Sequence, residues 1–183
     1  MFFSNIIVSG LLAATAAAMP APHAARSNPT STASASSSSS TGGGLQIVNN
    51  MDSTVYLWTT SDSSGDMQSI TSGGGTHSES WETNSNGGGI SIKLSTSESE
   101  DSVLQFEYTQ ETDDTLYWDL SSINLDSSSD FIKSGFAVTI SDDSCTAASC
   151  SAGDSDCLAS YQQPDDVDTN SCSTSASYTL TLG

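Results

Sequence analysis

Alternation of apolar and polar residues is most regular in the segment 103–126, where aromatic side chains are also densest. Its first half has the period-two pattern of a strand with one buried face. An acidic turn follows, and a second apolar run then leads back past the first. Glu107 and Asp119 are therefore expected on neighbouring strands that flank one turn. The apolar residues that define the first strand are Leu104, Phe106 and Tyr108.

Shorter segments of alternating or β-branched residues lie on both sides of this segment. Turns rich in Gly, Asn, Asp and Ser separate them, and no window has a helical period. We expect the first two to pair as a hairpin, and the whole to form an all-β sandwich or barrel with antiparallel pairing. The further expected strands cover residues 45–50, 54–60, 67–71, 90–94, 136–140 and 178–182.

The chain divides into three parts by composition. Residues 1–18 carry a short apolar run followed by small residues, which predicts a secretory signal peptide rather than a membrane span. Residues 19–44 are rich in Ser and Gly and have few apolar residues beyond Ala, which predicts a disordered leader. Residues 45–183 remain as one β-sandwich domain.

The protein is strongly acidic, with 22 Asp and Glu against three Lys and Arg and a formal net charge of -19. A field of this sign excludes nucleic acid as a partner and repels anionic lipid. It is compatible with cations and with neutral polysaccharide. The plainer interpretation, that the acids only keep a secreted protein soluble, stays open.

Four cysteines lie in the last quarter of the chain. An even number of cysteines in a secreted protein predicts two disulfides, and no histidine lies among them to complete a zinc site. The sequence leaves three pairings open. The pairing taken forward as the expectation is Cys145–Cys172 with Cys150–Cys157.

Three stretches of the domain carry recognisable motifs: LQIVNNMDSTVYLWTT, SGGGTHSESWETNSNGGGISIK and FEYTQETDDTLYWDLSSINLDSSSDFIKSGFAVTI. In this order they resemble the motifs of thaumatin-like proteins, above all the small secreted fungal proteins of the BYS type (yeast-phase-specific antigens). Met51 stands where the family usually has Cys. The resemblance implies an antiparallel β-sandwich, with a short disulfide-bonded loop region replacing the second domain of larger members.

In larger thaumatin-like proteins, an acidic cleft is linked to binding or weak hydrolysis of β-1,3-glucan. The resemblance places the cleft's Arg on Lys93, its Glu on Glu107 and its first Asp on Asp119. The second Asp falls on Asn124, and the third has no counterpart. Two neighbouring carboxyl groups are what glycoside hydrolysis requires.

Three further kinds of site can be considered from the sequence. Asp165, Asp166 and Asp168 give the oxygen-rich density that calcium accepts, without the order of an EF-hand. Solvated acidic turns are the commoner outcome, and we expect no cofactor. His77, the one histidine of the predicted domain, cannot form a copper or zinc site alone. The tryptophans form either a sugar-stacking surface or part of the core: Trp58, Trp81 and Trp118.

We therefore expect a secreted, monomeric, non-catalytic protein at or near a cell wall or cell surface. Its polar face around Lys93, Glu107 and Asp119 would bind neutral polysaccharide such as β-glucan, or a host surface protein. One alternative is a weak β-1,3-glucan hydrolase that uses Glu107 and Asp119. Another is a secreted adhesin or effector that binds a host protein.

Overall fold

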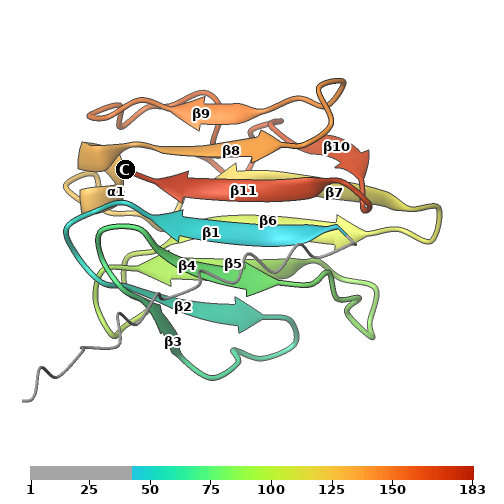
Figure 1. The fold of residues 1–183 in the computed structure, drawn as a ribbon, viewed down its shortest axis with the longest axis horizontal. Helices are drawn as coiled ribbons and strands as arrows, with labels where there is room; N and C mark the ends of the chain where they lie inside the picture. The colour runs from blue at the N-terminus through green and yellow to red at the C-terminus, as the bar shows by residue number, and fades with distance from the viewer. Residues whose placement is uncertain (1–42) are drawn as a thin grey trace, which may run out of the picture. The chain divides into compact units, whose positions relative to one another are not determined.

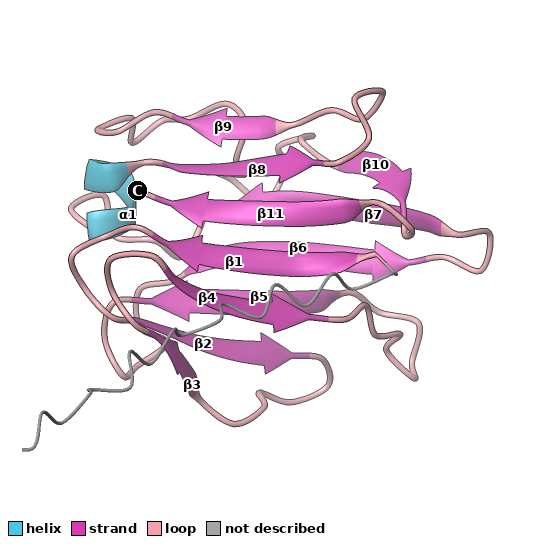
Figure 2. Ribbon diagram, viewed as in Figure 1, coloured by secondary structure: helices cyan, strands magenta, loops and turns pink. Residues whose placement is uncertain are grey.

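The computed structural model describes residues 43–183. The predicted signal peptide at 1–18 and nearly all of the predicted leader at 19–44 lie outside the described residues. The described part is two β-sheets packed face to face, which confirms the all-β sandwich (Figures 1 and 2). No helix in it has the length and apolar character of a membrane span.

Five strands form one sheet, onto which Figure 1 looks, and six form the other. In spatial order the first contains β4 (Gly75–Glu79), β1 (Gly44–Asn49), β11 (Ser177–Leu182), β8 (Phe136–Ile140) and β9 (Ala148–Cys150). The second contains β10 (Asn170–Ser173), β7 (Thr115–Ser121), β6 (Leu104–Gln110), β5 (Ile90–Ser95), β2 (Val55–Thr60) and β3 (Gln68–Ile70).

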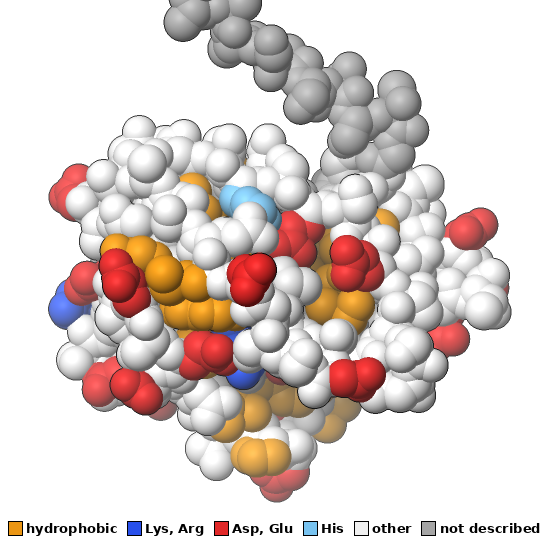
Figure 3. Space-filling model, turned by 90° about the horizontal axis from the view of Figure 1, so that it is seen from below, with side chains coloured by type: hydrophobic (Ala, Val, Ile, Leu, Met, Phe, Trp, Pro, Cys, Tyr) orange, Lys and Arg blue, Asp and Glu red, His pale blue; other side chains and the backbone are white. Residues whose placement is uncertain are grey.

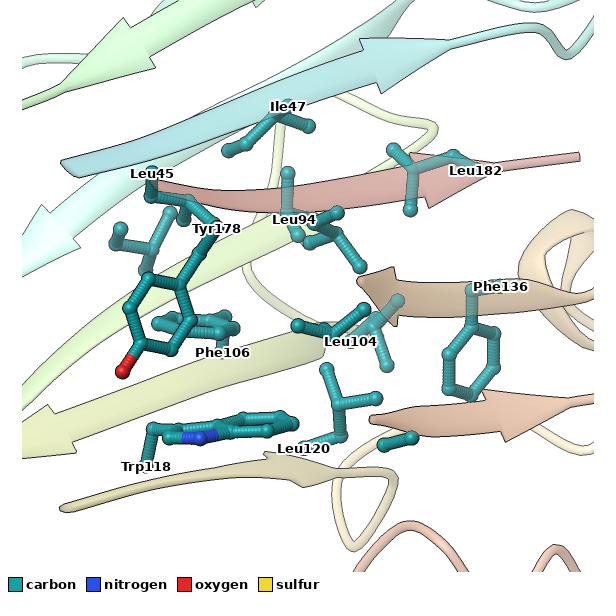
Figure 4. Close-up of a cluster of buried hydrophobic side chains, with 14 of the residues drawn as sticks. Leu45, Ile47, Leu94, Leu104, Phe106, Trp118, Leu120, Phe136, Tyr178 and Leu182 are labelled. Atoms are coloured by element: carbon teal, nitrogen blue, oxygen red, sulfur yellow. The ribbon is translucent and has the colours of Figure 1, made fainter. Parts of the chain in front are cut away.

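The core lies between the sheets, where alternate side chains of every long strand meet (Figure 4). Trp118 of β7 stacks on Phe106 of β6, with ring centroids 5.8 Å apart, and meets the edge of Tyr178 of β11 at 6.0 Å. Burying one such large side chain stabilises the fold by about 1.5–3 kcal/mol. Because the inner faces of β6 and β7 are fixed in this way, their outer faces form a rigid surface.

The expected hairpin between the first two strands is wrong, because β1 and β2 belong to different sheets. Asn49 at the end of β1 is fully buried, and its Nδ2 donates to the carbonyl oxygens of Ser53 (2.9 Å) and Thr71 (3.1 Å). Its Oδ1 accepts from the amide of Met51 (3.1 Å). This asparagine thus fixes a corner that carries the chain across the sandwich, where a tight hairpin turn was expected.

Two other features differ from the expectation. β1 runs parallel to β11, whereas every other paired strand of residues 43–183 is antiparallel to its neighbours. A short helix, α1 (Asp130–Ser134), precedes β8, and its N-cap is Ser129, whose side chain accepts from the amide of Ile132 (3.2 Å). A helix of this length is too short to show a helical period in the sequence.

The disulfide-bonded region between β8 and β11 contains two strands, β9 and β10, and each extends one of the sheets. Cys145 before β9 is joined to Cys172 of β10, so this bridge links the two sheets. The second bridge joins Cys150 of β9 to Cys157 in the following loop. This pairing is the one that was expected.

Candidate functional site

Register places four polar side chains in one row across the outer face of the six-stranded sheet. Thr60 pairs with Ser91, Ser91 with Glu107, and Glu107 with Asp119, on strands β2, β5, β6 and β7. Their sequence neighbours on β5 to β7 are buried apolar residues, so the row points away from the core. Thr169, just before β10, adjoins the row at its Asp119 end. We call these five residues the polar row.

The polar row lines a groove of about 520 Å³. Tyr117 also lines it, and 46% of this residue is exposed, which is high for a large aromatic side chain. Tyr117 lies within the second apolar run of the segment 103–126 and was not predicted as a site residue. The alternation could have found it, because Tyr117 lies two positions before Asp119 and so shares its face.

The two carboxyl groups of the row have raised pKa values. Burial is the main cause for Asp119, and the negative charges of Glu107 and then Asp168 add to it, which brings its pKa to about 7. Burial also raises the pKa of Glu107, although the charge of Lys93 and the hydroxyl of Ser91 offset part of the effect. Asp119 therefore retains its proton up to near-neutral pH.

Two predicted site residues do not reach the groove. The Lys93 ammonium binds Oε2 of Glu100 at 2.7 Å, so it acts on Glu107 only through its charge. Asn124 lies exposed in the turn beyond β7, where its carbonyl oxygen accepts from the amide of Val103 (3.0 Å). The structure thus brings together Glu107 and Asp119 and leaves Lys93 and Asn124 outside.

The predicted calcium residues form a loop closed by its own hydrogen bonds. Oδ2 of Asp166 accepts from the amides of Gln162 (2.7 Å) and Gln163 (2.8 Å). The carboxylates of Asp165, Asp166 and Asp168 do not gather within 4.8 Å of one another, as convergent ligands would. Asp168 instead acts on the groove, where its charge helps to raise the pKa of Asp119.

The tryptophans form no exposed platform. Trp58 and Trp118 are buried, with 7% and 0% exposed. Trp81 is half-buried against the core, and its Nε1 donates to the carbonyl oxygen of Thr174 (3.1 Å). The aromatic surface in the groove is therefore supplied by a tyrosine.

A two-sheet sandwich with a disulfide-bonded region is the fold expected of a thaumatin-like protein, and the relatives of this chain belong to that class. The chain belongs to the Bys1 family, described as Blastomyces yeast-phase-specific protein, whose family model matches residues 32–183. It is 43% identical over 183 residues to the secreted thaumatin-like protein calA of Emericella nidulans. That match covers 100% of this chain and 98% of calA.

A second relative is the antigenic thaumatin-like protein of Arthroderma benhamiae, 39% identical over 131 residues, or 71% of this chain and 65% of that protein. Among solved structures, the protein elicitor MoHrip2 from Magnaporthe oryzae has the same fold, with a TM-score of 0.62 and 21% identity. That match covers 76% of this chain and 98% of MoHrip2. The protein is thus a secreted, extracellular member of the thaumatin-like class.

Proposed function

We propose that this protein is a non-catalytic binding protein of the cell wall or cell surface, and that its groove holds a neutral polysaccharide of the β-glucan type. The observation that carries the proposal is the exposed ring of Tyr117 beside the polar row. Sugar rings present an apolar face and a rim of hydroxyl groups. An aromatic ring with hydrogen-bonding groups beside it complements both.

The polar row supplies the hydrogen bonds that this ligand requires. The hydroxyls of Thr60, Ser91 and Thr169 each have one hydrogen-bond partner, in Ser64, Gln105 and Tyr161, and each oxygen keeps a lone pair that can accept from a sugar hydroxyl. A carboxylate accepts from a sugar hydroxyl more strongly than a neutral group does, and a protonated carboxyl also donates. Asp119, whose pKa is raised to about 7, and Glu107 together provide both capacities.

A pull-down of the secreted protein on insoluble β-1,3-glucan, chitin and mannan tests the proposal. Tyr117→Ala is expected to abolish retention on β-1,3-glucan. The control is Tyr56→Ala, which changes a half-buried tyrosine of β2 that does not line the groove and is expected to leave retention intact. Absence of retention on every glycan would overturn the proposal and leave a protein partner as the remaining class.

A second candidate function, weak hydrolysis of β-1,3-glucan, is favoured by one observation. Asp119, with its pKa near 7, has the protonation state of a general acid, and Glu107 lies on the adjacent strand. Retaining glycosidases hold such groups about 5 Å apart. Reducing sugar is measured in the same tubes, and our proposal expects none. If the wild-type protein releases sugar, and if both Glu107→Gln and Asp119→Asn abolish that release, then the function is hydrolysis and the binding proposal is overturned.

A further inference from the structure

The groove does not end at the β2 side of the polar row. Ser61 and Ile90 line it, and the same two residues line a second hollow of about 540 Å³. This hollow lies where β2 of one sheet faces β4 of the other. Figure 3 views the molecule from the side on which β2 and β3 lie in Figure 1, and shows a histidine beside acidic surface. The polar lining of the hollow includes Thr59 and Gln68 with His77 and Glu79 of β4.

We propose that the second hollow is a further subsite for the same ligand, so that the protein binds an internal stretch of a polysaccharide chain. The chain would run along the polar row, cross at Ser61 and Ile90, and continue into the hollow beside His77 and Glu79. This inference rests on the proposed function, because it extends the site in which the glycan is held.

The hydrogen bonds inside the hollow leave acceptor capacity for a ligand. Oε1 of Glu79 accepts from Thr59 Oγ1 at 2.7 Å and pairs with His77 Nε2 at 3.0 Å. Oε2 of Glu79 has no hydrogen-bond partner among residues 43–183. The side chain is thus held in place from two strands while one oxygen stays free, as in a site that is formed before its ligand binds.

The distance along the polar row is long enough for an oligomer. From Asp119 on β7 to Thr60 on β2 the polar row crosses three strand spacings, or roughly 14 Å. At the crossing, Ser61 is exposed and has a small side chain. The hollow begins only beyond that point, so a ligand that touches both sites must be a chain of several sugar units.

Titration calorimetry with a β-1,3-linked disaccharide and hexasaccharide tests this inference. The hexasaccharide is expected to bind at least about tenfold more tightly, because its second contact is intramolecular. Gln68→Trp, which fills the hollow at a position that does not line the groove, is expected to remove this advantage and leave disaccharide binding unchanged. Ser69→Trp is the control, because it places the same side chain at the next exposed position of β3 without lining either site.

A second measurement locates the contact. In NMR spectra, the hexasaccharide is expected to shift the backbone amides of residues 77–79, while the disaccharide shifts only amides along the polar row. Equal affinities for the two ligands in wild type, or shifts confined to the polar row with both, would overturn the second subsite while the proposed function stands. No binding of either ligand would overturn the proposed function itself.

Discussion

Glu107 and Asp119 are direct cross-strand partners on β6 and β7, and both side chains lie on the outer face of the sheet. Directly opposed residues have Cβ atoms about 4.5–5.5 Å apart, and like charges at this spacing destabilise a sheet. The buried stacking of Trp118 on Phe106, their neighbours in sequence, fixes the register that imposes this contact. Two carboxyl groups are thus held together at a cost in stability, as occurs at ligand-binding sites.

The first prediction concerns the pH dependence of stability. The pKa of Asp119 is about 7 in the folded state against an ordinary value of 3.8, so the folded protein keeps a proton that the unfolded chain releases. The free energy of unfolding should therefore fall as pH rises from about 4 to about 7. Asp119→Asn should remove this loss and be more stable than wild type at about pH 8, by roughly 1–2 kcal/mol after allowance for solvent screening.

Urea denaturation at about pH 4 and about pH 8 measures the effect. The control is Asp52→Asn, at an exposed position in the turn after β1, for which we expect the same small change at both pH values. A difference between Asp119→Asn and wild type that does not change with pH would contradict the prediction.

The second prediction compares the two disulfides. Cys145–Cys172 spans 27 positions and Cys150–Cys157 only 7, so loop entropy assigns them stabilisations of about 3.5 and about 2.5 kcal/mol. Replacing the first pair with serine should therefore lower the denaturation midpoint more than replacing the second. Urea denaturation of the two double variants checks the order, and the reverse order would show that local packing outweighs loop length.

The third prediction concerns Gly135, which follows α1 with a φ of +81°. A Cβ atom there would lie 2.9 Å from both the carbonyl oxygen of Cys150 and the amide nitrogen of Ala152. Gly135→Ala should therefore destabilise the protein by about 2–4 kcal/mol through backbone strain and overlap. Gly153→Ala isolates the strain, because Gly153 has a φ of +83° with no atom within 4 Å, and should cost about 1 kcal/mol. Equal losses of stability, measured by thermal unfolding, would argue against the overlap.

The fourth prediction concerns the hydrogen bond that Thr59 of one sheet donates to Glu79 of the other. Burial raises the pKa of Glu79, but the hydrogen bonds from His77 and Thr59 outweigh it and the net pKa is lowered. Thr59→Val removes one of these bonds and should raise the pKa of Glu79, which NMR titration of its carboxyl carbon measures. It should also cost about 1 kcal/mol of stability at neutral pH.

The sign of that stability change with pH follows from the lowered pKa. Glu79 stabilises the fold above its ordinary value of 4.5, and the contribution is lost as pH falls. The deficit of Thr59→Val should therefore shrink in acid. Thr76→Val, on the exposed face of β4, serves as the control and should leave the Glu79 titration unchanged.

The sequence predicted those strand pairings that join segments adjacent in the chain. The pairing of Glu107 with Asp119 follows from alternation across a single turn, and each strand of that hairpin was found. The sheet to which each of the first two strands belongs was not predictable, because the corner depends on hydrogen bonds from Asn49 to Ser53 and Thr71. The pairing of β1 with β11 joins opposite ends of the described chain, so no local pattern in the sequence could predict it.

The same distinction applies to the site. The charge of Asp168 raises the pKa of Asp119 only because β10 pairs with β7. Nothing in the sequence of the intervening loop predicts this pairing. The hollow at His77 and Glu79 requires β4 of one sheet to face β2 of the other. Asn124, placed in the site by resemblance, is moved out of it by the turn that ends β7. Contacts between distant strands therefore decide which of the candidate residues meet.

The parallel pairing of β1 with β11 at the centre of the five-stranded sheet has a consequence for biogenesis. A chain that emerges from the ribosome and crosses a membrane N-terminus first presents β1 long before β11. Until β11 arrives, β1 lacks the neighbour through which β8 and β9 join the sheet, so this half of the sandwich cannot close. Loop-closure entropy makes such distant pairing slow. The protein is thus expected to complete its fold only after translocation, in the compartment where its disulfides form.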